Sequence, residues 1–304
     1  MMFGCPPPLC RATGGRYRGR ESNHQAESDW PLDLLQVIVL ALIQGITEFL
    51  PISSSGHLIL APLLGGWADQ GVLTDMVLNV GSLLAVIAYF WRDVLAMFSG
   101  LGDVAQRRHT ANARLMTCVA IGTVPILVMG LLLKVTHLDE HIRSAQLVAW
   151  NAIIFGVLLY IADRYGLFVK TIANIDWVQA LIIGCAQALA LSPGTSRSGI
   201  TMTAARGLGF SRPEAARFSF LLSIPANGAA SVLVIGDAIK SGEAVTSDMV
   251  VTGILTFCVA VATIAFLMRM LRRVSFLPFS VYRVILGMVL LALIYSGIPL
   301  GAVN

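Results

Sequence analysis

The sequence predicts an all-α protein that crosses a membrane several times. Only 12% of the 304 residues are charged and 56% are hydrophobic, whereas about a quarter of the residues in soluble domains are charged. Runs without acidic or basic residues recur along the chain, each approaching the roughly 20 residues that span a bilayer. Two further apolar segments are broken by proline, serine and glycine, which predicts helical hairpins that enter the membrane and turn back.

An unusual N-terminal stretch precedes these apolar runs. Residues 1–30 hold four arginines and three consecutive prolines, and we expect a disordered tail there, followed by a membrane domain at residues 31–304. The long runs that we expect to span the bilayer are residues 76–91, 115–133, 144–162, 218–236, 249–268 and 284–297.

The two broken segments, at residues 34–64 and 178–208, look like copies of one unit. The aligned pairs are Gln44 with Gln187, Ser53 with Ser196, Ser55 with Ser198 and Gly56 with Gly199. Matched broken helices are typical of repeats with a site at their interface. We therefore predict two inverted-topology repeats, at about residues 33–165 and 176–300, each a re-entrant helical hairpin plus three transmembrane helices.

The loop charges predict an orientation. With both hairpins re-entrant, the positive-inside rule makes the more basic side cytoplasmic and places both termini outside. The basic side holds Arg92, Arg107, Arg108, Arg114, Arg164, Lys170, Arg206, Arg212, Arg269, Arg272 and Arg273. The other side holds Lys134, Arg143 and Lys240, besides the tail. The basic residues form no cluster interleaved with aromatic residues, so we expect no nucleic-acid partner.

Few ionisable residues lie within the broken segments, and they are candidates for function because charge at membrane depth is costly. They include Glu48, His57 and Arg197. The alternative for Glu48 and Arg197 is a purely structural ion pair that holds the two hairpins together. Both segments carry Ser-x-Ser-Gly before a predicted helix, and helix N-termini suit phosphate. The predicted phosphate-binding residues are Ser53, Gly56, Ser196, Ser198 and Gly199.

The same residues allow two roles for Glu48. Gln44 and Glu48 share one helix face and could together hold a divalent cation, Mg²⁺ or Ca²⁺. Alternatively, Glu48 could orient His57, which can move a proton near neutral pH. The residues alone do not choose between these roles.

At these motifs the sequence resembles the bacterial undecaprenyl-diphosphatase family, also known as bacitracin-resistance proteins. The resemblance rests on residues 44–57, on Pro-Gly-Thr-Ser-Arg-Ser-Gly at residues 193–199, and on residues 211–225. It implies a multi-pass enzyme of the bacterial inner membrane whose site faces the periplasm. That enzyme hydrolyses a polyprenyl diphosphate, recycling the lipid carrier for cell-wall synthesis and conferring bacitracin resistance. The working residues implied are Glu48, Ser54, His57, Arg197 and Thr201.

Two functional hypotheses follow. In the phosphatase hypothesis, Arg197 and the helix N-termini hold the diphosphate, Ser54 attacks or directs a water, and His57, oriented by Glu48, moves the proton. Attack by His57 itself is a rival. The alternative is a polyprenyl-phosphate transporter, since broken helices in inverted repeats are a transporter architecture. A transporter needs the phosphate clamp but neither a nucleophile nor a base.

Overall fold

The computed structural model describes residues 33–67, 70–136, 144–166, 170–241 and 246–296. All of them belong to one compact unit, and the predicted tail lies outside the described residues. The described part of the chain is helical and contains no strand, only an isolated bridge between Lys170 and Phe210. The predicted all-α class is confirmed.

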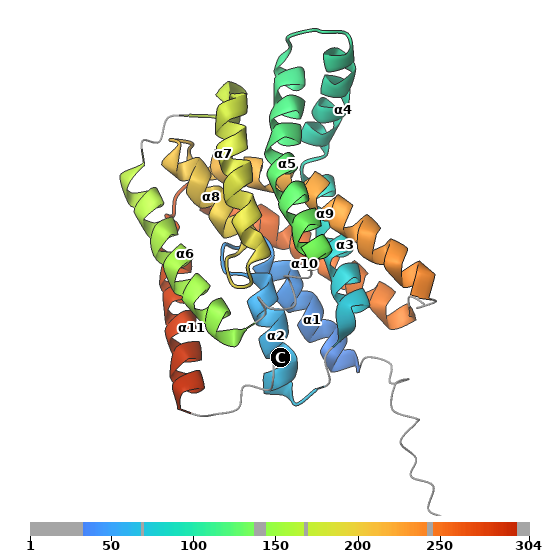
Figure 1. The fold of residues 1–304 in the computed structure, drawn as a ribbon, viewed down its shortest axis with the longest axis vertical. Helices are drawn as coiled ribbons and strands as arrows, with labels where there is room; N and C mark the ends of the chain where they lie inside the picture. Colours follow the sequence, from blue (N-terminus) through green and yellow to red (C-terminus); the bar gives the residue numbers. More distant parts are fainter. Residues whose placement is uncertain (1–32, 68–69, 137–143, 167–169, 242–245, 297–304) are drawn as a thin grey trace, which may run out of the picture. The chain divides into compact units, whose positions relative to one another are not determined.

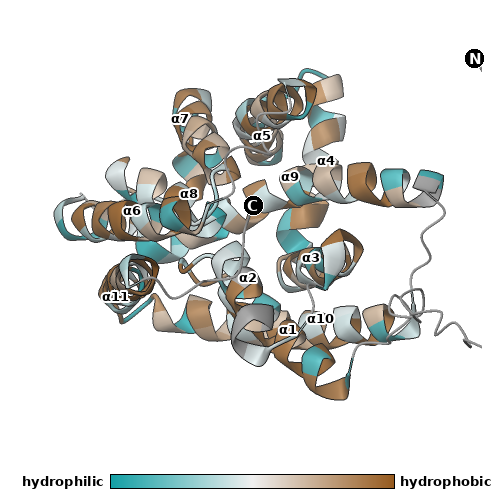
Figure 2. Ribbon diagram, turned by 60° about the horizontal axis from the view of Figure 1, so that its bottom comes forward, coloured by the Kyte–Doolittle hydropathy of each residue, from teal (hydrophilic) through white to brown (hydrophobic). Residues whose placement is uncertain are grey.

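Six helices are long and apolar enough to cross a membrane within the described ranges. They are α3 (Gly71–Tyr89), α5 (Ala111–Thr136), α6 (Ala145–Tyr165), α9 (Arg212–Ser241), α10 (Ser247–Met270) and α11 (Leu277–Tyr295). Each contains most of one predicted span, so the six predicted spans are confirmed as helices of sufficient length and apolar composition. Large apolar side chains such as Val128, Leu131 and Phe266 are more than 60% exposed. Figure 2 shows the brown colour of hydrophobic residues along the long helices. Such surfaces suit lipid rather than water.

The broken segments fold as two short helical pairs. The first pair is α1 (Leu34–Thr47) with α2 (Ser54–Gly65), and the second is α7 (Trp177–Ala188) with α8 (Arg197–Gly207). A single 3₁₀ turn, η3 (Leu189–Leu191), follows α7. Within each pair the two helices pack against each other, as expected for hairpins.

The two hairpins begin with the same helix-capping arrangement, an aspartate followed three residues later by a glutamine. The backbone N–H of Asp33, which precedes α1, donates to Gln36 Oε1 at 3.2 Å. The backbone N–H of Asp176, which precedes α7, donates to Gln179 Oε1 at 3.4 Å, and Asp176 Oδ1 accepts from the Gln179 N–H at 2.8 Å. This reciprocal capping satisfies donors that a helix start leaves unpaired. It extends the sequence correspondence to the residues that start each hairpin.

One end of the helix bundle is held together by Asp163, and we call it the Asp163 end. Asp163 Oδ1 accepts from Arg206 Nε at 2.9 Å and from Arg212 Nε at 2.8 Å, and Oδ2 accepts from the Phe276 N–H at 3.0 Å. These bonds join the ends of α6 and α8 to the starts of α9 and α11. Arg206, expected among the loop charges, is only 1% exposed; it is a buried ion-pair partner.

The opposite end is marked by two contacts between helix ends, and we call it the Asp237 end. Lys134 Nζ at the end of α5 lies 3.0 Å from Asp237 Oδ2 near the end of α9. Gln146 Nε2 at the start of α6 donates to the Tyr295 hydroxyl at the end of α11 at 3.2 Å. Helices α6, α9 and α11 therefore run from one end of the bundle to the other.

The α7–α8 hairpin opens at the Asp163 end. The 3₁₀ turn η2 (Ile172–Asn174) before α7 is bound there, because the Ile172 N–H donates to Glu214 Oε2 at 2.9 Å. Arg206, at the other limb of the hairpin, bonds to Asp163 at the same end. The chain thus enters and leaves on one side, as a re-entrant segment does.

The α1–α2 hairpin opens at the Asp237 end. Helix α3 finishes at the Asp163 end, because the next helix, α4 (Trp91–Ala105), carries Asp93, whose Oδ2 lies 3.2 Å from Arg217 Nε near the start of α9. The start of α3, a few residues after α2, therefore lies at the Asp237 end. Figure 1 shows the turns of the two hairpins facing each other. The inverted-repeat relationship of the complete halves stays a prediction.

Helix α4 departs from the expected plan, which placed its residues in a loop between two spans. Its tight packing on α5 explains the difference. A Cβ added at Gly100 would lie 2.3 Å from the Asn112 carbonyl oxygen, so only glycine allows the two backbones to approach so closely. No helix of the described second half occupies the corresponding place between α9 and α10.

The arrangement of helix ends predicts the sidedness of the loops. A reporter fused after Arg108 and a reporter inserted within residues 241–247 should be recovered on opposite sides of the membrane. A third reporter after Ser296 should match the one within residues 241–247, because α11 finishes at the Asp237 end. Accessibility to a membrane-impermeant reagent measures this. Recovery of the first two on the same side would contradict six spans with two re-entrant hairpins.

Candidate active site

The two hairpin turns share an uncommon backbone conformation. Ser53 has a φ of 76° and Ser196 a φ of 66°, in the left-handed region that non-glycine residues seldom adopt. Each serine immediately precedes the short returning helix, α2 or α8. The turns therefore bring two helix N-termini, whose first N–H groups have no partner within the helix and whose dipole ends are positive, into the interior of the protein.

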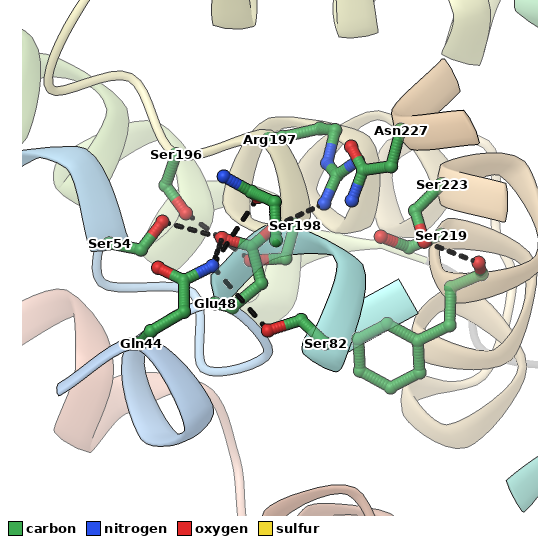
Figure 3. A network of polar contacts seen from close by, with 12 residues as sticks. Gln44, Glu48, Ser54, Ser82, Ser196, Arg197, Ser198, Ser219, Ser223 and Asn227 are labelled. Carbon is green, nitrogen blue, oxygen red and sulfur yellow. Dashed lines mark hydrogen bonds and ion pairs between the residues drawn. The ribbon is translucent and has the colours of Figure 1, made fainter. Parts of the chain in front are cut away.

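Glu48 is the centre of the first turn. It follows the last residue of α1, and its N–H donates to the Gln44 carbonyl oxygen at 3.1 Å. Its Oε2 accepts from Ser54 Oγ at 2.6 Å and from Gln44 Nε2 at 3.2 Å. Figure 3 shows the carboxylate between these groups. The predicted candidates Glu48, Ser54 and Gln44 therefore lie together.

Arg197 connects the second turn to the first. One terminal nitrogen, Nη2, contacts Glu48 Oε1, and the other, Nη1, contacts Asn227 Oδ1 of α9. The side chains of Arg197 and Glu48 are only 16% and 9% exposed. Ser198 Oγ also donates to the Leu50 carbonyl oxygen at 3.2 Å across the turns. The structure thus brings residues of both hairpins into one site, as the sequence predicted.

Gln44 has further polar neighbours on α3. Its Nε2 lies 3.4 Å from both Asn79 Oδ1 and Ser82 Oγ. Its Oε1 is buried and has no hydrogen-bond partner among the described residues. The amide nitrogen of Gln44, not this oxygen, faces the Glu48 carboxylate, so the amide would have to turn for Oε1 and Glu48 to share a cation. No group of three His, Cys, Asp or Glu side chains is suitable for a metal in the described ranges.

His57 does not have the partner that we expected. Its Nδ1 lies 2.7 Å from the Ser53 carbonyl oxygen, and its Nε2 lies 2.6 Å from the Tyr282 hydroxyl of α11. Both ring nitrogens are therefore engaged by groups other than Glu48. The idea that Glu48 orients His57 is wrong for this structure, because the carboxylate is instead used by Ser54, Gln44 and Arg197.

The second turn is built around Ser196 and Gly199. Ser196 Oγ accepts from the Gly199 N–H at 3.2 Å and lies 3.3 Å from Ser198 Oγ. In the first turn, Ser53 Oγ lies 3.2 Å from Ser55 Oγ in the same way. The predicted phosphate-binding serines thus lie at the N-termini of α2 and α8.

The remaining predicted residues, Gly56 and Thr201, pack against neighbouring protein groups. Gly56 faces α6, where an added Cβ would make an ordinary 3.5 Å contact with Val148. Thr201 is completely buried, and its hydroxyl lies 2.6 Å from Ser219 Oγ and 2.8 Å from the Arg197 carbonyl oxygen. Its contact with substrate stays a prediction.

Arg283 of α11 is a buried cation that sequence reasoning missed. Its Nη2 lies 3.0 Å from the Gly194 carbonyl oxygen and 2.7 Å from that of Thr195. Its Nε and Nη1 have no hydrogen-bond partner in the described part of the chain. An added Cβ at Gly199 would lie only 2.6 Å from Nη1. Arg283 therefore braces the second turn and adds positive charge beside it.

Other missed residues are neutral and lie within the spans: Asn79, Ser82, Asn227 and Tyr282. Charge counting passes over them, because neutral polar side chains do not interrupt an apolar run. Asn79 and Asn227 could have been found from the sequence, because amide side chains are unusual at membrane depth and face protein rather than lipid.

The arrangement suits chemistry at a phosphate group. It combines a hydroxyl already bonded to a carboxylate, an arginine that can grip phosphate oxygens with two parallel bonds, and two helix N-termini. Phosphoryl transfer requires a positioned nucleophile and positive charge around the phosphate oxygens.

Comparisons with known proteins agree with this chemistry. The family model described as "Bacitracin resistance protein BacA" matches residues 37–289. A protein of Erythrobacter litoralis named "Undecaprenyl-diphosphatase" is 46% identical over 283 residues, which cover 86% of this chain and 99% of that protein. A protein of Alcanivorax borkumensis with the same name is 48% identical over 262 residues, covering 86% and 98% of the two chains.

The second turn provides a stability prediction. Gly194 has a φ of +83°, and an added Cβ would lie 2.5 Å from the Val148 carbonyl oxygen. Gly194→Ala should therefore lower the free energy of unfolding by about 2 kcal/mol, through backbone strain and overpacking. Gly102→Ala is the control, because that glycine is helical with open space around it. Unfolding in detergent should separate the two variants, and equal stability would contradict the turn geometry.

Proposed function

Because the chain belongs to the family of bacitracin resistance proteins BacA, we propose that it hydrolyses undecaprenyl diphosphate to undecaprenyl phosphate and inorganic phosphate. The activity would return the lipid carrier to cell-wall synthesis and confer bacitracin resistance. The observation that carries the proposal is the meeting of Ser54, Glu48 and Arg197 at the two hairpin turns. Phosphate release from the lipid by the purified protein tests it.

The mechanism that we propose begins with an exchange of partners at Arg197. A diphosphate at the turns competes with Glu48 for the guanidinium, and planar bidentate bonds favour the phosphate oxygens. Glu48 then remains bonded to Ser54. In one route the Ser54 hydroxyl attacks the terminal phosphorus, the bridging P–O bond breaks to release the lipid monophosphate, and a water then hydrolyses the phosphoserine to free inorganic phosphate. In the other route Ser54 directs a water to the terminal phosphorus, and the lipid monophosphate leaves in the same step. In either route the carboxylate accepts the proton that the attacking oxygen loses. The N–H groups at the starts of α2 and α8 stabilise the added charge.

His57 has a different place in this proposal from the one that the sequence indicated. Its ring bonds to Ser53 and Tyr282, so in this arrangement it holds the turn beside Ser54. Glu48, which accepts directly from Ser54 Oγ at 2.6 Å, is better placed to take the proton. Attack by His57 itself would first require its ring to leave both partners.

A divalent cation is the cofactor that we propose. Glu48 and Gln44 are the residues that would hold it, once the Gln44 amide turns so that Oε1 in place of Nε2 faces the carboxylate. Mg²⁺ and Ca²⁺ prefer oxygen ligands of this kind. When bound, the cation would offset negative charge on the phosphate oxygens.

We also propose a location and an orientation. The basic loops at the Asp163 end favour the cytoplasm by the positive-inside rule, so the Asp237 end and the opening of the first hairpin would face the periplasm. The protein would then lie in the bacterial inner membrane with its site open to the periplasm. The reporter fused after Arg108 tests this orientation: it should be found in the cytoplasm, and a periplasmic location would reverse the proposal.

A polyprenyl-phosphate transporter is the second candidate. The observation that favours it is that the two hairpins open at opposite ends of the bundle, which suits access from either side. A transporter has no use for a hydroxyl bonded to a carboxylate, so the Ser54–Glu48 contact favours the phosphatase.

Variants separate catalysis from binding. Ser54→Ala and His57→Ala should bind a non-hydrolysable diphosphate lipid almost normally, yet turn over substrate about 10²-fold more slowly or worse, as expected for loss of a nucleophile or its support. Arg197→Lys should weaken both binding and turnover, because it loses the planar fork. Phosphate release and analogue binding are measured on the same preparations. Near wild-type turnover in both alanine variants would favour the transporter.

The proposed cation site predicts that a second carboxylate at position 44 tightens cation binding. Gln44→Glu should retain activity and reach half-maximal rate at a lower Mg²⁺ or Ca²⁺ concentration, because two carboxylates hold a divalent cation more tightly than one. Activity titrated against each cation after chelation measures this. Activity that survives chelation in both proteins would exclude the cation, and loss of activity at every concentration would show that the amide is needed.

A further inference from the structure

The ring of His57 is held by groups from distant parts of the chain. On one side is the Ser53 carbonyl oxygen of its own hairpin, and on the other is the Tyr282 hydroxyl of α11. The rings of His57 and Tyr282 are nearly parallel, with an interplanar angle of 11° and centroids 5.8 Å apart. This contact ties the first hairpin to the last described helix.

The chemistry of the two partners determines the tautomer. A carbonyl oxygen can only accept, so Nδ1 of His57 carries the proton that Ser53 accepts. In the neutral ring Nε2 then holds the lone pair, and the Tyr282 hydroxyl is the donor to it. The lone pair of His57 is therefore occupied by Tyr282.

From this geometry, and resting on the proposed phosphatase function, we propose that Tyr282 is a positioning residue of the active site. Its hydroxyl fixes the tautomer and the ring plane of His57, and His57 in turn fixes the Ser53 carbonyl. Ser53 directly precedes Ser54, whose hydroxyl lies 2.6 Å from Glu48 Oε2. Tyr282 thereby acts on the proposed nucleophile through two hydrogen bonds.

The position of Tyr282 on α11 strengthens this role. The next residue, Arg283, donates from Nη2 to the carbonyl oxygens of Gly194 and Thr195 in the other hairpin. Two consecutive residues of one helix therefore hold the turns of both hairpins. Helix α11 sets the position of Ser54 relative to Arg197, on which in-line attack depends.

The variant Tyr282→Phe removes only the hydroxyl. We expect its turnover rate to fall about tenfold, as for the loss of one hydrogen bond to a positioned group. KM should change little, because Tyr282 is not among the groups that we propose to hold the phosphate. Tyr295→Phe is the matched control: it lies on the same helix and loses a hydroxyl bonded to Gln146 at the Asp237 end. Its turnover should equal that of the wild type. Equal turnover in Tyr282→Phe would overturn the proposal.

A double variant tests whether Tyr282 acts through His57. In the His57→Ala background, Tyr282→Phe should cause no further loss of turnover, because residues that act as one unit are not additive. A further tenfold loss would overturn the proposal and show that Tyr282 acts by another route.

A chemical measurement makes the test independent of activity. Diethyl pyrocarbonate modifies neutral imidazole at a free lone pair, so His57 should react faster in Tyr282→Phe than in the wild type or Tyr295→Phe, as read by mass spectrometry. Equal reaction rates would overturn the proposal. A wild-type protein that releases no phosphate would instead refute the proposed function, while the reaction rates still decide whether Tyr282 holds the ring.

Discussion

The ion pair between Glu48 and Arg197 is the contact on which the site depends. It joins the turns of two hairpins from separate halves of the chain, and both side chains are largely shielded from water. Removing one partner of such a buried pair costs about 3–5 kcal/mol in proteins, because the other charge is left uncompensated. The pair therefore keeps the two turns together and, in the mechanism that we propose, holds Arg197 beside a carboxylate that the diphosphate displaces.

The irregular backbone of the two hairpin turns is stable inside the bundle because other protein groups form hydrogen bonds with it. Irregular backbone at membrane depth survives only where it is enclosed by protein or lines a polar cavity. Ser53 and Ser196 adopt a left-handed conformation that costs free energy, and hydrogen bonds from His57 and Gly199 to these serines support it. The same turns aim the starts of α2 and α8 at one place. The features that make each turn possible are thus also those that form the phosphate site that we propose.

Local patterns predicted much of this molecule, and long-range contacts account for what they missed. The spans are visible as charge-free runs, and the hairpins as broken apolar segments with matching serines. Helix α4 carries charges and two glycines, features that in a sequence resemble a loop, yet Gly100 is what allows its close packing on α5. The partner of His57 could not be foreseen, since Tyr282 lies far along the chain. Arg283 was missed because the expected span was started just after it.

Arg283 also has a consequence for how the protein is made. A guanidinium within a membrane helix adds about 2.5–3.5 kcal/mol to the free energy of insertion when it faces lipid alone. The carbonyl groups that receive it belong to Asn151, Gly194 and Thr195, all of which are synthesised before α11. Helix α11 can therefore enter the membrane against a partner that has already been inserted. Assembly in chain order, from the hairpins towards the C-terminus, supplies the polar acceptors before the charge arrives.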